Sequence, residues 1–277
     1  MKIIRATKLF TSCRKCGIMT KKVKGVGIMK KILTAMLAGA LLLCTSCSGG
    51  ESSSEAETAA VTEVSKLGYD DVKAPVDAKW FDDAVFVGDS VTLKLNYYCD
   101  EHPEALGSAQ FFCAGSLGFE SALWDIDRED AVHPYYKGSV QLVEDCVKLT
   151  GAKKVFVMLG MNDIGNYGTD GAMESARNLI GKLKSKSDGA LIYLQSVTPI
   201  LEGHEYDELS NTHVRAFNEK LQAFCKEEGY KYLDIYSVMA DENGYLRAEY
   251  CGDEEAQGIH FTDEACGIWA DYLKQNV

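Results

Sequence analysis

The distribution of hydrophobic and polar residues after Trp80 predicts strands and helices in alternation. Short runs of apolar and β-branched residues indicate buried strands, and five such runs occupy residues 84–87, 110–113, 154–159, 190–197 and 232–235. Between them apolar residues recur at a helical spacing, over residues 91–98, 138–150, 170–186, 210–228 and 262–274. Strand and helix in repetition predict an α/β fold, with a parallel sheet that helices cover on both faces.

Glycine and polar residues follow four of the predicted strands. These segments are Gly88-Asp89-Ser90, Gly115, Gly160-Met161-Asn162-Asp163 and Thr198-Pro199. Ligands of parallel sheets bind at the carboxyl ends of the strands, so these segments indicate a site at that edge. Ser90 would lie at a strand-to-helix turn, where a serine can cap the helix or act as a nucleophile beside its N–H groups.

Four motifs occur in the order that is typical of the SGNH, or GDSL, hydrolases. The chain resembles this family in Gly88-Asp89-Ser90, Gly115, Gly160-Met161-Asn162-Asp163 and Gly258-Ile259-His260. The resemblance covers about residues 80–277, which we expect to form one hydrolase domain. It implies a flavodoxin-like, three-layer sandwich with a central five-stranded parallel sheet.

The resemblance also implies a role for each motif. Ser90 would be the nucleophile and His260 the base that removes its proton, because a serine hydroxyl is a poor nucleophile on its own. The Ser90 N–H, the Gly115 N–H and the Asn162 amide would stabilise the oxyanion, and Asp163 would fix a turn. The expected substrates are small acyl esters, with acetyl esters on carbohydrate or cell-wall glycan as the leading candidates. No metal or organic cofactor is required.

The sequence departs from the family where the family has an aspartate three residues before the histidine. That position is Gln257, which cannot supply the charge that orients an imidazolium. Three alternatives remain open: Asp253, Glu254 or Glu255 serves His260; a backbone carbonyl or the Gln257 amide orients it; or activity is reduced or lost. The last alternative would leave a non-catalytic glycan-binding lipoprotein, and a surface O-acetyltransferase is a further candidate.

A second serine has a competing context. Ala114-Gly115-Ser116-Leu117-Gly118 resembles a nucleophile elbow with alanine in place of its first glycine. This alternative leaves the blocks at Ser90 and Asn162 unexplained. The segment 119–137 contains several aromatic and acidic residues, and we expect a loop that either shapes a substrate pocket or is a surface excursion.

Charge is distributed very unevenly along the 277 residues. The formal net charge is −12, yet ten of the 29 lysines and arginines precede Cys47 and no acidic residue precedes Glu51. The remainder therefore carries 19 basic and 41 acidic residues, a balance that repels phosphate backbones and argues against nucleic-acid binding.

The basic N-terminal region has the pattern of an export signal. Met29-Lys30-Lys31 precedes an uncharged, mostly apolar stretch at 32–43, which is short for a membrane span. Leu43-Cys44-Thr45-Ser46-Cys47 resembles a lipobox, so Cys47 is the predicted lipidation site; an ordinary cleaved signal is the alternative. We therefore expect a signal at 1–47 with Met29 as the possible true start, and a flexible tether at 48–79. The protein would be lipid-anchored on the extracellular face of a bacterial membrane, or secreted.

Six cysteines follow Cys47, at a wide spacing that matches neither a zinc pattern nor a compact disulfide framework. Cys113, Cys146 and Cys225 lie in apolar or helical patterns and are expected to be buried free thiols. A Cys251–Cys266 bridge remains open. The histidines show no convincing metal-ligand spacing.

Overall fold

The computed structural model describes residues 74–277. The predicted export signal, the predicted lipidation site Cys47 and the predicted tether up to residue 73 lie outside the described residues. The described strands are β1 (Ala84–Gly88), β2 (Gln110–Cys113), β3 (Tyr135–Tyr136), β4 (Ser139–Val140), β5 (Lys154–Met158), β6 (Leu191–Gln195) and β7 (Lys231–Leu233). The α-helices are α2 (Ser90–Glu101), α3 (Pro103–Leu106), α4 (Val143–Thr150), α5 (Met161–Lys186), α6 (Asn211–Glu228), α7 (Ile235–Met239) and α8 (Asp263–Asn276). Short 3₁₀ turns lie at Ala78–Phe81, Ser121–Leu123 and Ala248–Tyr250.

Five strands form one parallel sheet in the order β2-β1-β5-β6-β7. This is the flavodoxin-like strand order, and it confirms the fold class expected from the sequence. Gly88, the last residue of β1, pairs with Cys113 of β2 on one side and with Met158 of β5 on the other. The segments that follow these three strands therefore emerge next to one another.

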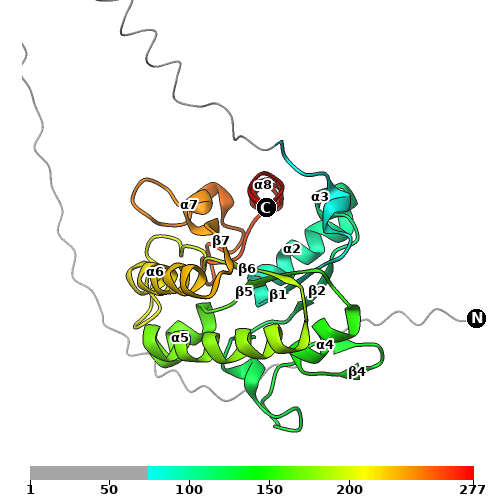
Figure 1. The fold of residues 1–277 in the computed structure, drawn as a ribbon. Helices are drawn as coiled ribbons and strands as arrows, with labels where there is room; N and C mark the ends of the chain where they lie inside the picture. The colour runs from blue at the N-terminus through cyan, green and yellow to red at the C-terminus, as the bar shows by residue number, and fades with distance from the viewer. Residues whose placement is uncertain (1–73) are drawn as a thin grey trace, which may run out of the picture. The chain divides into compact units, whose positions relative to one another are not determined.

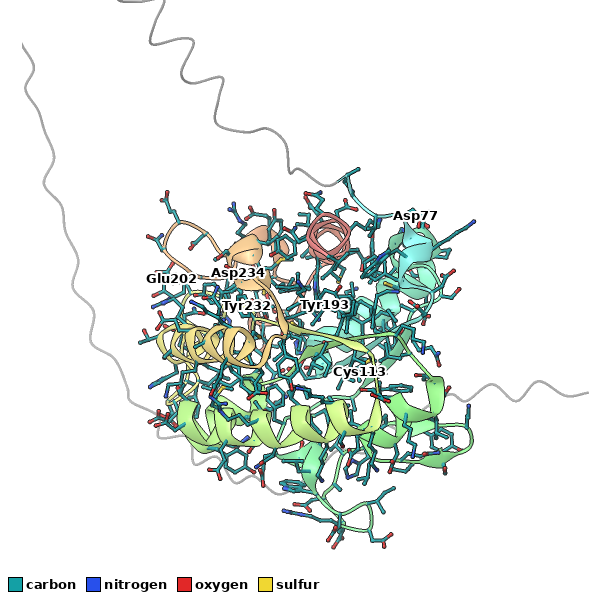
Figure 2. All side chains as sticks on the ribbon, viewed as in Figure 1. Asp77, Cys113, Tyr193, Glu202, Tyr232 and Asp234 are labelled. Carbon is teal, nitrogen blue, oxygen red and sulfur yellow. The ribbon has the colours of Figure 1, made fainter. Side chains whose placement is uncertain are left out.

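Helices cover both faces of the sheet, with α4, α5 and α6 on one face and α2, α7 and α8 on the other (Figure 1). Successive side chains of β1 alternate between the two cores: Val85 and Val87 face the first group of helices, while Phe86 faces the second. Phe86, Phe156 and Tyr193 stack across three neighbouring strands, with ring centroids 4.6 and 4.5 Å apart. Figure 2 shows Tyr193 in the layer between the sheet and α8.

Several element boundaries differ from those expected. The helix predicted at 170–186 begins at Met161, because a kink at Gly168 (φ 66°, ψ 176°) joins two helical segments. Residues Tyr135–Tyr136 and Ser139–Val140 pair as a short antiparallel hairpin, so the helix predicted from residue 138 begins at Val143. The last strand ends at Leu233, since the Asp234 carboxylate caps α7 by accepting from the Ser237 N–H.

The first described segment returns to the end of the chain, where the Val76 N–H donates to the Lys274 carbonyl at 2.9 Å. Within the described part of the chain, no helix combines the length and the apolar character needed to span a membrane.

All six cysteines of the described region are free thiols, so Cys251 and Cys266 do not form the bridge that the sequence left open. Cys146 and Cys225 are buried and Cys113 is half-buried. Burial raises the pKa of the Cys113 and Cys225 thiols to about 12.

Candidate active site

The nucleophile candidate lies at the junction of β1 and α2. Ser90 is the first residue of the helix, and the residue that caps the helix is Asp89, whose carboxylate accepts from the Val91 N–H at 2.9 Å. The sequence alone left open whether Ser90 is the cap. With Asp89 in that role, the Ser90 hydroxyl is available for other contacts.

Gly88 allows the first turn of α2 to pack against the end of its own strand. A Cβ atom at this position would lie 1.9 Å from Thr92 Oγ1, and Thr92 is itself fully buried. Only glycine fits this contact without a backbone shift, which explains the residue type at the start of the motif.

His260 connects the Ser90 hydroxyl to a carboxylate. Its Nε2 lies 2.9 Å from Ser90 Oγ, and its Nδ1 lies 2.7 Å from Asp253 Oδ2. An ionised carboxylate only accepts hydrogen bonds, so Asp253 favours the tautomer with the proton on Nδ1. The lone pair of Nε2 then faces the serine hydroxyl, as a general base requires.

Asp253 is the acid that sequence reasoning could not select. Its Oδ1 accepts from the backbone N–H groups of Ile259 and His260, both at 3.0 Å. Partial burial by itself would raise the pKa of Asp253, but the hydrogen bonds from the His260 ring and backbone outweigh burial and hold that pKa below its ordinary value. Glu254, Glu255 and Gln257 are exposed, and the hydrogen bonds of the His260 ring go to Asp253 and Ser90 instead.

Backbone pairing brings Asp253 and His260 together although seven residues separate them. The Gly252 N–H donates to the His260 carbonyl at 2.8 Å, and Cys251 forms a β-bridge with Phe261. These contacts close residues 252–260 into a loop, and Asp253 and His260 lie side by side where its two ends meet. The family spacing of three residues gives no signal for this arrangement; Gly252 and Gly258 on either side of the acidic run were the available hint.

The two further oxyanion-hole candidates follow the strands on either side of β1. Asn162 lies in the first turn of α5, where its Nδ2 donates to the Leu117 carbonyl at 3.0 Å. This bond fixes the amide plane, and the amide carries a second hydrogen. Gly115 follows β2, and a Cβ atom there would meet nothing within 4 Å, so the space beside it is open. The arrangement leaves room for a substrate oxygen to approach.

Asp163 has the structural role expected from the sequence. Its buried carboxylate accepts from the backbone N–H groups of Phe119 and Glu120, each at 2.8 Å. Burial raises the pKa of Asp163, and these two hydrogen bonds oppose that rise. The contacts tie the segment after β2 to the start of α5.

Ser116 lacks the helix that follows the serine of a nucleophile elbow. It is exposed and has a positive φ of 62°, as an elbow serine would, but the chain continues as a turn and irregular backbone. The hydrogen bond of His260 Nε2 goes to Ser90. The structure therefore assembles a base around Ser90 and none around Ser116.

A pocket of about 180 Å³ lies beside Asn162. The segment after β2 and the first turns of α5 supply its lining, which consists of Ser116, Gly118, Ser121, Trp124, Asp130, Val132, Asn162, Asp163, Asn166 and Tyr167. The predicted loop at 119–137 thus contributes to a pocket rather than being only a surface excursion. Within residues 74–277, no three histidine, cysteine, aspartate or glutamate side chains gather as a metal site.

Comparison with known proteins identifies the family. The family model for GDSL-like lipases and acylhydrolases matches residues 86–266, about two thirds of the chain. The chain belongs to this family. As a GDSL-like acylhydrolase it is grouped with ester-hydrolysing enzymes, and its four motifs all lie within this match. A search of curated protein sequences finds no match.

Solved structures support the fold of this GDSL-family chain. A GDSL-like lipase from Bacteroides thetaiotaomicron VPI-5482 is 17% identical, with a TM-score of 0.53 over 79% of this chain and 95% of that one. A protein from Streptococcus pneumonia named for platelet activating factor is 21% identical, with a TM-score of 0.51 over 77% of this chain and 88% of that one. A G-D-S-L family protein from Desulfitobacterium hafniense DCB-2 is 14% identical, with a TM-score of 0.51 over 70% and 98% of the respective chains. At these identities the likeness concerns the fold alone.

Proposed function

We propose that this chain is a serine esterase that forms an acyl-enzyme at Ser90. The observation that carries the proposal is the continuous set of hydrogen bonds from Ser90 Oγ through the His260 ring to Asp253, at 2.9 and 2.7 Å. This set resembles the nucleophile, base and orienting acid of serine hydrolases in its geometry.

The reaction proceeds in two balanced steps. In the first, His260 Nε2 takes the proton of Ser90 as Oγ bonds to the ester carbonyl carbon, and His260 then gives that proton to the departing alcohol. In the second, water attacks the acyl-serine while His260 accepts its proton, and the proton returns to Ser90 as the carboxylic acid leaves. Asp253 stays ionised throughout and accepts the hydrogen bond of the His260 Nδ1–H.

Negative charge develops on the substrate carbonyl oxygen in both steps. The N–H groups of Ser90 and Gly115 and the amide of Asn162 are the proposed donors to this oxygen. Donors that are already fixed need no reorganisation when the charge appears, and such preorganisation is a large part of catalysis.

The pocket beside Asn162 supports an acylated carbohydrate as the substrate. Trp124 and Tyr167 offer aromatic surface, while Asp130 and Asn166 offer hydrogen-bonding groups. Arg128 lies over the Trp124 ring and pairs with Asp130. The small volume of the pocket suits an acetyl ester better than a long acyl chain. With the predicted export signal and lipidation at Cys47, the proposed setting is cell-wall or surface glycan at the extracellular face of a bacterial membrane.

Active-site labelling with a fluorophosphonate and peptide mapping tests the mechanism. We expect the label on Ser90 of the wild type and no label on Ser90→Ala, with much slower labelling of His260→Ala. Release of p-nitrophenol from p-nitrophenyl acetate should follow the same order. Labelling at Ser116, or a wild type that neither reacts nor turns over the ester, would contradict the proposal.

Substitution in the pocket tests the substrate class. In Trp124→Ala, KM for an acetylated oligosaccharide should rise about 10-fold, the scale of one lost apolar contact, while p-nitrophenyl acetate turnover changes little. Tyr135→Ala is the matched control, since Tyr135 is 70% exposed and lies on the β3–β4 hairpin outside the pocket lining. Equal kinetics of Trp124→Ala and the wild type on both substrates would exclude this pocket. Analysis of products with an acceptor glycan present separates hydrolysis from acetyl transfer to a sugar hydroxyl.

A further inference from the structure

The proposed catalytic acid begins a loop whose core contact is confined to its far end, at Gly258 and Ile259. Residues 254–257, which separate Asp253 from His260, are all exposed. Within the loop, the Asp253 carbonyl accepts from the N–H groups of Ala256 at 2.8 Å and Gly258 at 3.3 Å. These local bonds shape the turn but attach it to no other element.

His204 makes the attachment at both ends of this loop. Its Nε2 lies 2.5 Å from the carbonyl oxygen of Glu254, the residue directly after the catalytic acid. Its ring also packs on Gly258, where a Cβ atom would lie 2.5 Å from His204 Cγ. One side chain therefore touches the loop where it leaves Asp253 and where it returns toward His260.

His204 is itself anchored in the segment between β6 and α6. Its backbone N–H donates to the Leu201 carbonyl at 3.1 Å. Its Nδ1 lies 3.2 Å from the Glu202 carbonyl, but a neutral imidazole has a single N–H, and the shorter contact at Nε2 assigns that proton to the bond with Glu254. The same segment holds the loop through a backbone bond, because the Leu201 N–H donates to the Gly258 carbonyl at 2.8 Å. The backbone of His204 is thus fixed independently of the contacts that its ring makes with the loop.

We propose that His204 is a positioning residue that holds the Asp253 carboxylate in line with the His260 ring. The inference rests on the proposed function, since it assigns the support of the same site. It also explains how this chain can place its acid seven residues before the histidine. The family aspartate would stand three residues before the histidine, where this chain has Gln257, and contacts from the β6–α6 segment support the more distant Asp253 instead. Gly258, with a positive φ of 65°, has no side chain to push the His204 ring away.

Kinetics and proton NMR of His204→Ala test this role. We expect kcat for p-nitrophenyl acetate to fall by up to about 100-fold, the effect of a small misplacement of a catalytic group, with KM changed less than about twofold. The low-field resonance of the His260 Nδ1 proton should broaden or disappear, because its acceptor Asp253 is no longer held.

A conservative variant and a matched histidine complete the test. His204→Gln keeps an N–H donor for the Glu254 carbonyl and should recover most of kcat and the resonance. His213→Ala should resemble the wild type, because His213 contacts Ser210 and Glu208 instead of the loop. An unchanged resonance and kcat in His204→Ala, or no recovery in His204→Gln, would overturn the proposal. A wild type with the resonance but no esterase activity would instead contradict the proposed function, since the resonance requires no turnover.

Discussion

The two halves of the candidate site are held in place by different forces. On the nucleophile side, all five residues of β1 are buried between two neighbouring strands, and Asp89 and Thr92 beyond it are buried as well. On the base side, Asp253 and His260 are half-buried. Ile259 packs in the core beside the histidine, while hydrogen bonds fix the position of the acid. Nucleophile placement should therefore be insensitive to surface changes, while orientation of the base depends on a few polar contacts.

Removing the charge of the orienting acid should have the largest effect. In Asp253→Asn we expect kcat/KM for p-nitrophenyl acetate to fall by about 10³- to 10⁴-fold, because an amide neither stabilises the imidazolium nor favours the required tautomer. Steady-state kinetics with a thermal unfolding control measure this. Glu254→Gln and Glu255→Gln are the matched controls and should stay near the wild type. A comparable loss in either control would show that the acid is misassigned.

Loss of an oxyanion donor should come next. Asn162→Ala is expected to lower kcat by about 10²- to 10³-fold, the usual result of deleting one such donor. Because Asn162 belongs to a helix packed on the core, the low-field proton of His260 should persist in this variant. A change in kcat below about twofold would exclude Asn162 from the oxyanion hole, and Asn276→Ala at the end of α8 controls for non-specific effects.

A smaller effect, on stability rather than rate, should appear at the helix cap. Burial raises the pKa of Asp89 to about 6, although hydrogen bonds from the Val91 and Thr92 N–H groups and the nearby His260 oppose the rise. Between about pH 4 and pH 6 the unfolded chain has released this proton while the folded protein retains it, so Asp89 makes the protein less stable as pH rises through this window. Asparagine also caps helices well and does not titrate.

Asp89→Asn should therefore gain stability relative to the wild type between pH 4 and pH 7, by at most about 3 kcal/mol. Urea unfolding of both proteins across this pH range measures the difference. If the unfolding free energies of the two proteins changed in parallel with pH, the buried Asp89 carboxyl would not destabilise the protein in this window.

The sequence predicted the parts of the molecule that depend on local patterns. Apolar runs located the five sheet strands, and the motif order placed Ser90, Asn162 and His260 at one edge of the sheet. The acid could not be selected, because the contact between Asp253 and His260 depends on how the backbone closes between them. The start of α5 was also missed. A glycine such as Gly168 favours the end of a helix, but in the structure the helix continues through Gly168 with a kink.

The bond between Val76 and Lys274 has a consequence for how the domain can be re-engineered. Because the two ends of the folded unit meet, a short linker would join them, and the chain could be opened elsewhere without crossing the core. The turn at residues 187–190, between α5 and β6, is a suitable new opening because it lies outside both halves of the site. A circular permutant cut there would carry Ser90 and His260 near the middle of one continuous polypeptide, with the order of the four motifs rotated. Catalysis by such a permutant would show that the chemistry depends on where the strand ends meet and not on the order of the motifs along the chain.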